Sequence, residues 1–177
     1  VAFIDYPKYG YRSWQTYFSR ILWRLKVKVD KETLTTIVKL LEGKQYQLYP
    51  DAAEAVVKAK NCGFKTSTVT TIAYFQFKKA VKPIRKCFDF IMTGYEAGCD
   101  KTNPKMYRKV LEILDVKPEE AVMIGDDPPI DIILPKKLGL NTILLDRERK
   151  MVSCQFSDAI VENLLEAVRM VEAWIRR

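Results

Sequence analysis

The sequence contains no histidine, and it has only four cysteines among 177 residues. The cysteines are Cys62, Cys87, Cys99 and Cys154. They show no CxxC spacing. Because histidine is absent, a Cys/His zinc site is excluded, and so are Ser–His and Cys–His nucleophile pairs. Any bound metal should therefore have oxygen ligands. Scattered thiols are typical of a reducing compartment, which favours the cytoplasm.

Long apolar segments are also missing. No apolar run approaches the roughly 20 residues that span a bilayer. The opening segment VAFIDYPKYG lacks the basic region and long apolar stretch of a signal peptide. Hydrophobic residues still make up 48% of the chain, which is enough for the core of one domain. We expect no membrane partner.

The positive charge of the chain is unevenly spread. The net charge is +8, and the stretch from Lys8 to Gln45 holds nine Lys or Arg residues against three Asp or Glu. One interpretation is a solvated, lysine-rich surface. The other is a basic lid that attracts a small anionic substrate. A nucleic-acid partner is not expected, because no nucleic-acid motif accompanies the charge.

The first quarter of the chain predicts one strand and two helices. The apolar segment 1–4 reads as a short strand that ends at Asp5. Apolar residues then recur at helical spacing over 12–25 and again over 31–42. No strand pattern separates these two segments. We therefore expect residues 8–45 to form a helical insertion.

Strands and helices alternate in the rest of the chain. Asp51 followed by Glu54 predicts a capping box at the start of a helix. Strand patterns then cover 64–71, 88–94, 121–125 and 141–145, with helical patterns between them and after the last. Such alternation predicts an α/β fold with a parallel sheet covered on both faces.

Polar side chains follow the predicted strands at the edge where parallel sheets bind ligands. They are Asp5, Thr70, Thr71, Lys101, Asp126, Asp127 and Asp131. Carboxylates of this kind are suited to Mg²⁺. A lysine and a hydroxyl are suited to the oxygens of a phosphoryl group. Asp127 is better interpreted as a helix-start residue than as a ligand.

Four segments in order resemble the motifs of the haloacid dehalogenase (HAD) superfamily of hydrolases. VMIGDDPPIDIILPKKLGLNTILLDR resembles the fourth motif, GDxxxxD, through Gly125, Asp126 and Asp131. GYEAGCDKTNPKMYRKVLEIL is similar to the third, with Lys101 as its lysine. GFKTSTVTT resembles the second, which places its Thr at Thr70. The first motif begins at Asp5.

The resemblance implies a fold, a cofactor and residue roles. It implies a Rossmann-like core of residues 1–7 and 46–177, a central parallel sheet, and a small helical cap at 8–45 inserted after the first strand. The expected activity is hydrolysis of a small phosphorylated compound with Mg²⁺. The implied assignments are Asp5 as nucleophile, Lys101 as a catalytic and phosphate-binding residue, Thr70 and Thr71 as phosphate-binding residues, and Asp5, the Pro7 carbonyl, Asp126 and Asp131 around the metal.

The first motif departs from the DxDxT pattern of the family. Pro7 occupies the position of the second Asp, which protonates the leaving group in the family and then activates water. Proline retains a carbonyl but supplies no acid. The dehalogenase branch also lacks this Asp, so carbon–halogen hydrolysis is an alternative. A non-catalytic protein that binds metal and phosphate is another.

Pro135 should kink or shorten the helix expected after Asp131.

Overall fold

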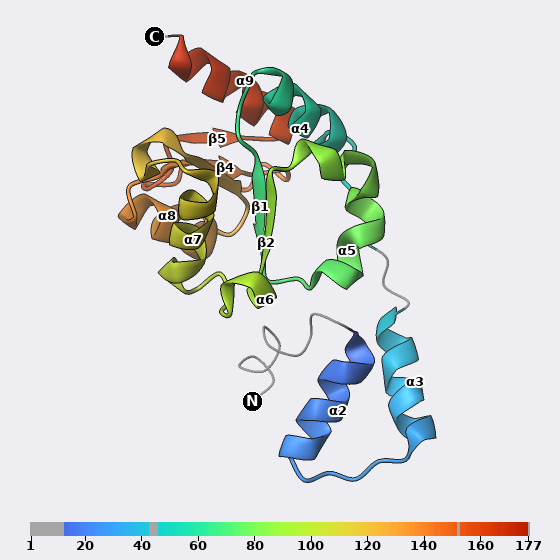
Figure 1. Ribbon diagram of the computed structural model, residues 1–177. Helices are drawn as coiled ribbons and strands as arrows, with labels where there is room; N and C mark the ends of the chain where they lie inside the picture. The colour runs from blue at the N-terminus through green and yellow to red at the C-terminus, as the bar shows by residue number, and fades with distance from the viewer. Residues whose placement is uncertain (1–12, 43–45, 152, 177) are drawn as a thin grey trace.

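The chain forms an α/β structure with short parallel strands. The computed structural model describes residues 13–42, 46–151 and 153–176. Figure 1 shows the strands at the centre of the larger part, with helices around them. The strands are β1 (Ser67–Thr70), β2 (Phe90–Thr93), β3 (Val122–Gly125), β4 (Asn141–Leu145) and β5 (Ala159–Val161). They confirm the α/β class and the four strand positions predicted after residue 60, although β1 is shorter than its pattern.

The strands form two parallel sheets. In one, β1 pairs with β2, and Thr70 lies opposite Thr93 at their carboxyl ends. In the other, the order is β3-β4-β5. Within the described ranges, β1 and β3 do not pair with each other. The predicted central strand ending at Asp5 lies outside the described residues, so its place between β1 and β3 stays a prediction.

Helices connect the strands as the alternation predicted. Asn103 accepts a hydrogen bond from the Lys105 N–H and caps α7, with Pro104 at the first helical position. The α-helices are α2 (Trp14–Arg24), α3 (Lys31–Glu42), α4 (Ala52–Asn61), α5 (Tyr74–Val81), α6 (Gly94–Ala97), α7 (Pro104–Leu114), α8 (Leu134–Lys137) and α9 (Leu164–Ile175). The 3₁₀ helices are η1 (Lys82–Cys87) and η2 (Pro118–Glu120), and η3 (Pro128–Ile133) is a π-helix.

The core consists of several apolar clusters that attach helices to the sheets. Met92 of β2 packs with Met106 and Val110 of α7. Ile143 of β4 packs with Ala167 of α9. Burial of a side chain such as Met or Ile stabilises the fold by about 1.5–3 kcal/mol. The strand ends that carry the predicted site residues are therefore supported by well-packed helices.

The two N-terminal helices form a hairpin beyond the carboxyl ends of β1 and β2 (Figure 1). Tyr17 and Ile21 of α2 and Val38 of α3 are buried. The ring of Trp14 meets that of Phe75, on α5, edge-on at a centroid distance of 6.0 Å. This contact joins the start of α2 to α5.

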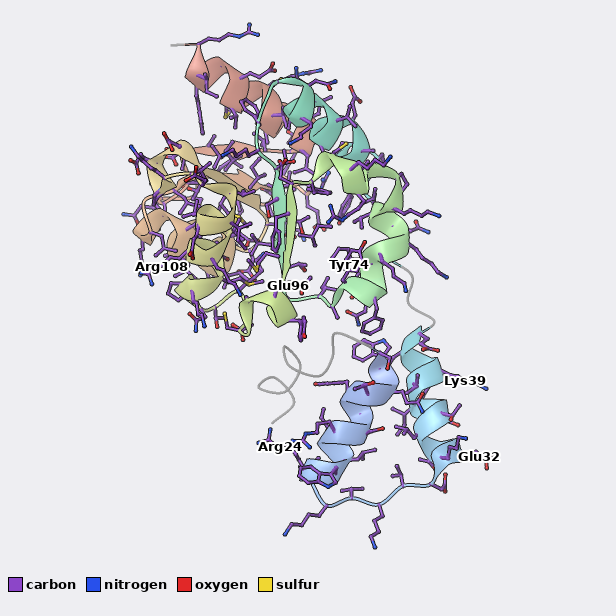
Figure 2. All side chains as sticks on the ribbon, in the orientation of Figure 1. Arg24, Glu32, Lys39, Tyr74, Glu96 and Arg108 are labelled. Carbon is purple, nitrogen blue, oxygen red and sulfur yellow. The ribbon has the colours of Figure 1, made fainter. Side chains whose placement is uncertain are left out.

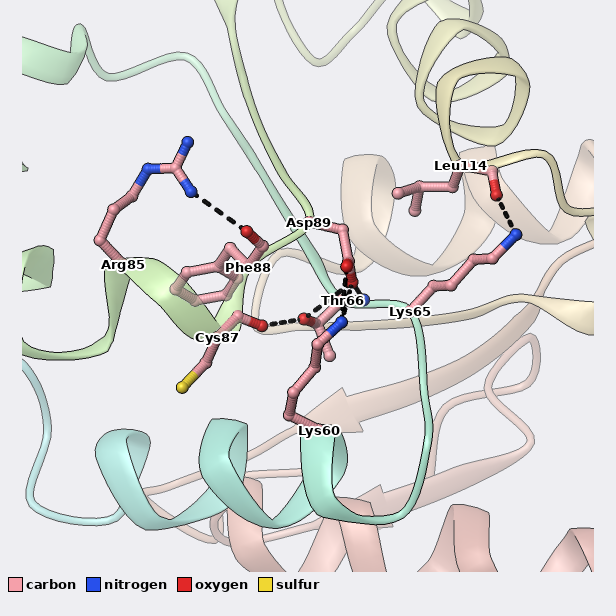
Figure 3. Close-up of polar contacts among 8 residues, drawn as sticks. All are labelled: Lys60, Lys65, Thr66, Arg85, Cys87, Phe88, Asp89 and Leu114. Carbon is pink, nitrogen blue, oxygen red and sulfur yellow. Dashed lines mark hydrogen bonds and ion pairs between the residues drawn. The ribbon is translucent and has the colours of Figure 1, made fainter.

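A polar network joins the amino ends of β1 and β2, at the edge opposite to the predicted site (Figure 3). Lys60 Nζ lies 2.5 Å from Asp89 Oδ1, and Asp89 Oδ2 accepts the Thr66 N–H at 2.7 Å. The Thr66 hydroxyl donates to the Cys87 carbonyl. The Lys60 hydrogen bond, helped by that of Thr66, holds the pKa of Asp89 below its usual range. These charges support the fold and lie away from the predicted site.

Asp51 corrects one local prediction. It precedes α4, but its side chain makes no capping bond, so the capping box with Glu54 is wrong. Its carboxylate instead accepts two hydrogen bonds from Arg147, at 2.9 and 3.1 Å, and one from the Leu164 N–H at 2.6 Å. The local pattern predicted that this carboxylate caps α4. It binds instead to partners that are 96 and 113 residues away in the sequence.

Neither β5 nor α6 was predicted, because both are too short for a periodic pattern. No helix in the described part of the chain is long and apolar enough to cross a membrane.

Candidate active site

The loop after β3 carries the acidic residues of the candidate site. β3 ends at Gly125, and Asp126 and Asp127 follow as exposed residues. The π-helix η3 then begins and carries Asp131 inward, so that its side chain is buried. The structure thus places one predicted carboxylate at the surface of the strand end and another beneath it.

Lys101 and Asp131 form a buried ion pair. Lys101 Nζ lies 2.5 Å from Asp131 Oδ1, and both side chains are largely removed from water. Lys101 belongs to the turn before α7, whereas Asp131 follows β3. A buried charge is costly without a partner. Pairing across 30 residues of sequence therefore joins the third and fourth predicted motifs at one point.

Gly125 leaves room for the Asp131 carboxylate. A Cβ at position 125 would lie 2.4 Å from Asp131 Cγ and Oδ2. No side-chain carbon can occupy that space, so the residue before Asp126 must be glycine while Asp131 keeps its position. The glycine of the GDxxxxD pattern is explained by this close approach.

Two hydrogen bonds connect Asp127 with Asp131, one between their backbones and one to the Asp131 carboxylate. The Asp131 N–H donates to the Asp127 carbonyl at 2.7 Å, and the Asp127 N–H donates to Asp131 Oδ2 at 3.3 Å. Asp127 immediately precedes η3, which agrees with its interpretation as a helix-start residue. Asp126 is left exposed on the outer side of the loop.

The donor set is compatible with a hard cation. Asp131 is buried, and its Oδ1 is paired with the Lys101 ammonium at 2.5 Å. Asp126 adds a second carboxylate. Residues 13–42, 46–151 and 153–176 contain no group of three or more acidic or thiol side chains placed to hold a metal. Asp5 and Pro7, which the prediction adds to the set, lie outside them.

Thr70 ends β1 and Thr71 follows it, at the carboxyl end of the strand. Thr70 Oγ1 accepts a hydrogen bond from the Ile72 N–H at 3.0 Å, which turns the chain toward α5. A hydroxyl that accepts one bond retains its own proton for donation. The Thr70 hydroxyl therefore keeps a proton to donate, and its role in binding phosphate stays a prediction.

Glu96 lies at the carboxyl end of β2 and was not predicted as part of this edge (Figure 2). Its carboxylate accepts hydrogen bonds from the N–H and hydroxyl of Thr93, the residue opposite Thr70. This reciprocal cap closes the start of α6. A Thr followed three residues later by Glu was a readable signal for it.

The hairpin of α2 and α3 brings many positive charges to the site end of the molecule. Its described part contains six Lys or Arg residues: Arg20, Arg24, Lys26, Lys28, Lys31 and Lys39. Figure 2 shows Lys39 and Glu32 pointing outward from α3. The guanidinium of Arg20 lies over the ring of Trp23, 4.3 Å from its centroid. These charged side chains are mostly exposed, so both the solvated surface and the basic lid stay open as interpretations.

Tyr107 of α7 was missed by the sequence interpretation. It is almost fully buried, and its hydroxyl donates to the Ile130 carbonyl at 2.6 Å. Burial, followed by the nearby charges of Asp131 and Asp127, raises the pKa of the Tyr107 hydroxyl well above its usual value. In the sequence Tyr107 is one aromatic residue on an apolar helix face, so no pattern distinguishes it.

Comparison with known proteins identifies related sequences. A family model described as a haloacid dehalogenase-like hydrolase matches residues 8–139. The glyceraldehyde 3-phosphate phosphatase of Methanopyrus kandleri is 34% identical over 101 residues, which are 56% of this chain and 43% of that protein. The phosphoserine phosphatase of Thermus thermophilus is 30% identical over 134 residues, which are 75% of this chain and 54% of that protein. The chain thus spans about half the length of these relatives.

Solved structures share the fold. A HAD phosphatase from Thermococcus onnurineus superposes with a TM-score of 0.67 at 23% identity, covering 92% of this chain and 74% of that one. A 2-haloacid dehalogenase from Pseudomonas syringae pv. Tomato DC3000 superposes with a TM-score of 0.70 at 20% identity, covering 97% and 76%. At these identities the likeness establishes the fold, and the two neighbours differ in reaction.

Proposed function

Since the chain belongs to the haloacid dehalogenase-like hydrolase family, we propose that it is a phosphatase that hydrolyses a small phosphorylated compound. The buried pair of Lys101 and Asp131 beside Gly125 carries this proposal. It supplies a positive charge for a phosphoryl group and a carboxylate for a cation, next to the exposed Asp126. Relatives named as phosphatases support the same reaction class.

The proposed chemistry uses Asp5 as the nucleophile. Its carboxylate attacks phosphorus, the bond from phosphorus to the leaving-group oxygen breaks, and an aspartyl phosphate forms. Water then attacks that phosphorus, releases inorganic phosphate and regenerates Asp5. Lys101 has three donors, so it can keep one directed at Asp131 while another approaches a phosphoryl oxygen. Thr70 and Thr71 would donate to the remaining oxygens.

Mg²⁺ is the proposed cofactor. Asp5, the Pro7 carbonyl and Asp126 would hold it, with Asp131 supporting the site. When bound, it supplies charge stabilisation for the phosphoryl oxygens. The fit rests on the oxygen-only donor set, in which the exposed Asp126 and the buried Asp131 belong to the same loop after β3.

The leaving group receives no proton from position 7, because Pro7 stands where the acid would be. General acid–base assistance contributes about 10²–10⁴-fold. We therefore propose that substrates with good leaving groups react fastest. The residue Pro7 also favours a second candidate, a dehalogenase-type hydrolase, which needs no such acid. The third candidate is a protein that binds metal and phosphate without turnover.

We further propose three-carbon phosphate esters as the first compounds to test, because relatives are named for glyceraldehyde 3-phosphate and phosphoserine. The cap formed by the helical region 8–45 would attract them through its positive charge. A cytoplasmic location is consistent with the four cysteines being free.

A substrate panel separates the candidates. The chain is assayed against alkyl phosphates, aryl phosphates and 2-haloacids, each with Mg²⁺ and with a chelator. Phosphate release that depends on Mg²⁺ supports the phosphatase. Halide release that is independent of metal favours the dehalogenase. Binding of Mg²⁺ and phosphate with no product from any compound favours the binding protein.

A further inference from the structure

The peptide bond between Ile130 and Asp131 is held on both sides. Its N–H, from Asp131, donates to the Asp127 carbonyl at 2.7 Å. Its C=O, from Ile130, accepts from the Tyr107 hydroxyl at 2.6 Å. A peptide unit is planar, so two bonds on opposite sides fix its orientation. The direction in which the Asp131 side chain leaves the backbone is thereby constrained.

The Ile130 carbonyl needs this outside donor because of Pro135. In η3 the bonds run from a carbonyl to the N–H five residues later, as from Pro129 to Leu134. The next bond would join Ile130 to position 135, where proline has no N–H. The π-helix ends there, and Pro135 becomes part of the short helix α8. The predicted effect of Pro135 on this helix is confirmed, and it leaves one carbonyl to be satisfied from elsewhere.

Tyr107 can supply that donor only because α7 holds it rigidly. The side chain is 2% exposed and lies among the fully buried residues of the core. A hydroxyl on a buried ring has little freedom, so its position is set by helix packing. The packing of α7 therefore sets the position of the Tyr107 hydroxyl, and the hydrogen bond from this hydroxyl holds the loop that carries Asp131.

We infer that Tyr107 is a positioning residue, which orients Asp131 through the Ile130 carbonyl and so maintains the cation site. This inference rests on the proposed function for the role of Asp131, but the positioning itself is a property of the protein without ligand. Residues that support metal ligands in this way commonly change metal affinity by about 10- to 100-fold when they are removed.

The test compares Tyr107→Phe with Val110→Ala. The first removes one hydroxyl and keeps the ring, whereas the second creates a cavity on the same helix without touching the Ile130 peptide. Amide hydrogen exchange measured by NMR on the metal-free protein reports the Asp131 N–H, with the Ile143 N–H of β4 as reference. A titration with Mg²⁺ alone follows on each protein.

In Tyr107→Phe we expect exchange of the Asp131 amide to accelerate about 10-fold relative to Ile143, because its peptide unit has lost one of two anchors. Val110→Ala should change the exchange rates of both amides by the same factor. Equal acceleration of both amides in Tyr107→Phe, or none, would overturn the inference. Mg²⁺ affinity should fall about 10-fold or more in Tyr107→Phe only. Wild type that binds no Mg²⁺ would contradict the proposed function, while the exchange result would still decide the positioning.

Discussion

Gly125 and Asp131 approach each other so closely that a Cβ on the first would overlap the carboxylate of the second, at 2.4 Å from its Cγ. Nothing in the backbone requires glycine at position 125, since its φ is not in the left-handed region. Glycine is needed at position 125 because the Asp131 carboxylate occupies the space that a Cβ would fill. Glycine is therefore required here for space and not for backbone flexibility.

Gly125→Ala should displace Asp131 and weaken both the fold and the cation site. The expected loss of unfolding free energy is about 1–3 kcal/mol, typical of an overpacked core. A double-mutant cycle with Asp131→Ala is the control, measured by urea denaturation. Alanine at 125 should cost less in the Asp131→Ala background, because the clashing group is gone. Equal costs in both backgrounds would show that the two residues do not interact.

The Asp51 carboxylate should stabilise the protein at neutral pH but not in acid. Burial opposes its ionisation, but the Arg147 and Leu164 hydrogen bonds outweigh burial and hold the pKa below its ordinary value of 3.8. The stabilisation is therefore complete above about pH 5 and is lost as the pH falls through the lowered pKa. Asp51→Asn should lose about 1–3 kcal/mol at pH 7 and approach wild type in acid.

Glu54→Gln is the matched control for Asp51, since it removes the other residue of the rejected capping box. Glu54 is exposed, so its replacement should change the unfolding free energy by less than about 0.5 kcal/mol at either pH. Unfolding curves in urea at pH 7 and in acid compare the two variants. A large loss in Glu54→Gln would restore the capping box that the structure rejects.

The sequence predicted those features that depend on local periodicity. The helices α2, α3 and α9 follow from apolar spacing. Features that depend on residues far apart in the sequence could not be predicted from it. Asp51 is the clearest case, because Arg147 and Leu164 compete for its carboxylate only once the chain is folded.

The candidate site was predictable in its residues but not in its geometry. Lys101 and Asp131 were both named from motif spacing, but their ion pair depends on packing between two loops. Tyr107 had no recognisable pattern, since its role arises from a proline 28 positions later in the chain. The positions of Asp5 and Pro7 lie outside the described residues, and their roles stay predictions.

The charge of the helical hairpin should affect association with an anionic substrate. Arg20→Gln, Lys26→Gln and Arg12→Gln should each lower kcat/KM, and the difference from wild type should shrink as salt rises past about 0.1 M, where the screening length is about 10 Å. Lys86→Gln, which replaces an exposed lysine of η1, is the control and should have little effect. A wild-type kcat/KM that is independent of salt would favour a merely solvated surface.

Pro7→Asp should increase phosphatase activity by supplying the missing acid. The gain could reach about 10²-fold, and it should be larger for alkyl than for aryl phosphates, because poor leaving groups need protonation most. Pro7→Asn is the matched control, since it removes the proline ring but cannot donate the proton. An equal gain in both variants would mean that loop freedom, not acid catalysis, is responsible. No gain in Pro7→Asp would point to an acid from elsewhere in the chain.

The covalent role of Asp5 can be measured by mass spectrometry of the enzyme quenched in acid during turnover with Mg²⁺ and the best phosphate ester of the panel. A phosphoryl group is expected on the peptide that contains Asp5, and it should be absent in Asp5→Asn, which should also lose turnover. The opposite result would be steady phosphate release with Asp5 never modified and with Asp5→Asn as active as wild type. That outcome would contradict a phosphatase that works through an aspartyl intermediate at Asp5.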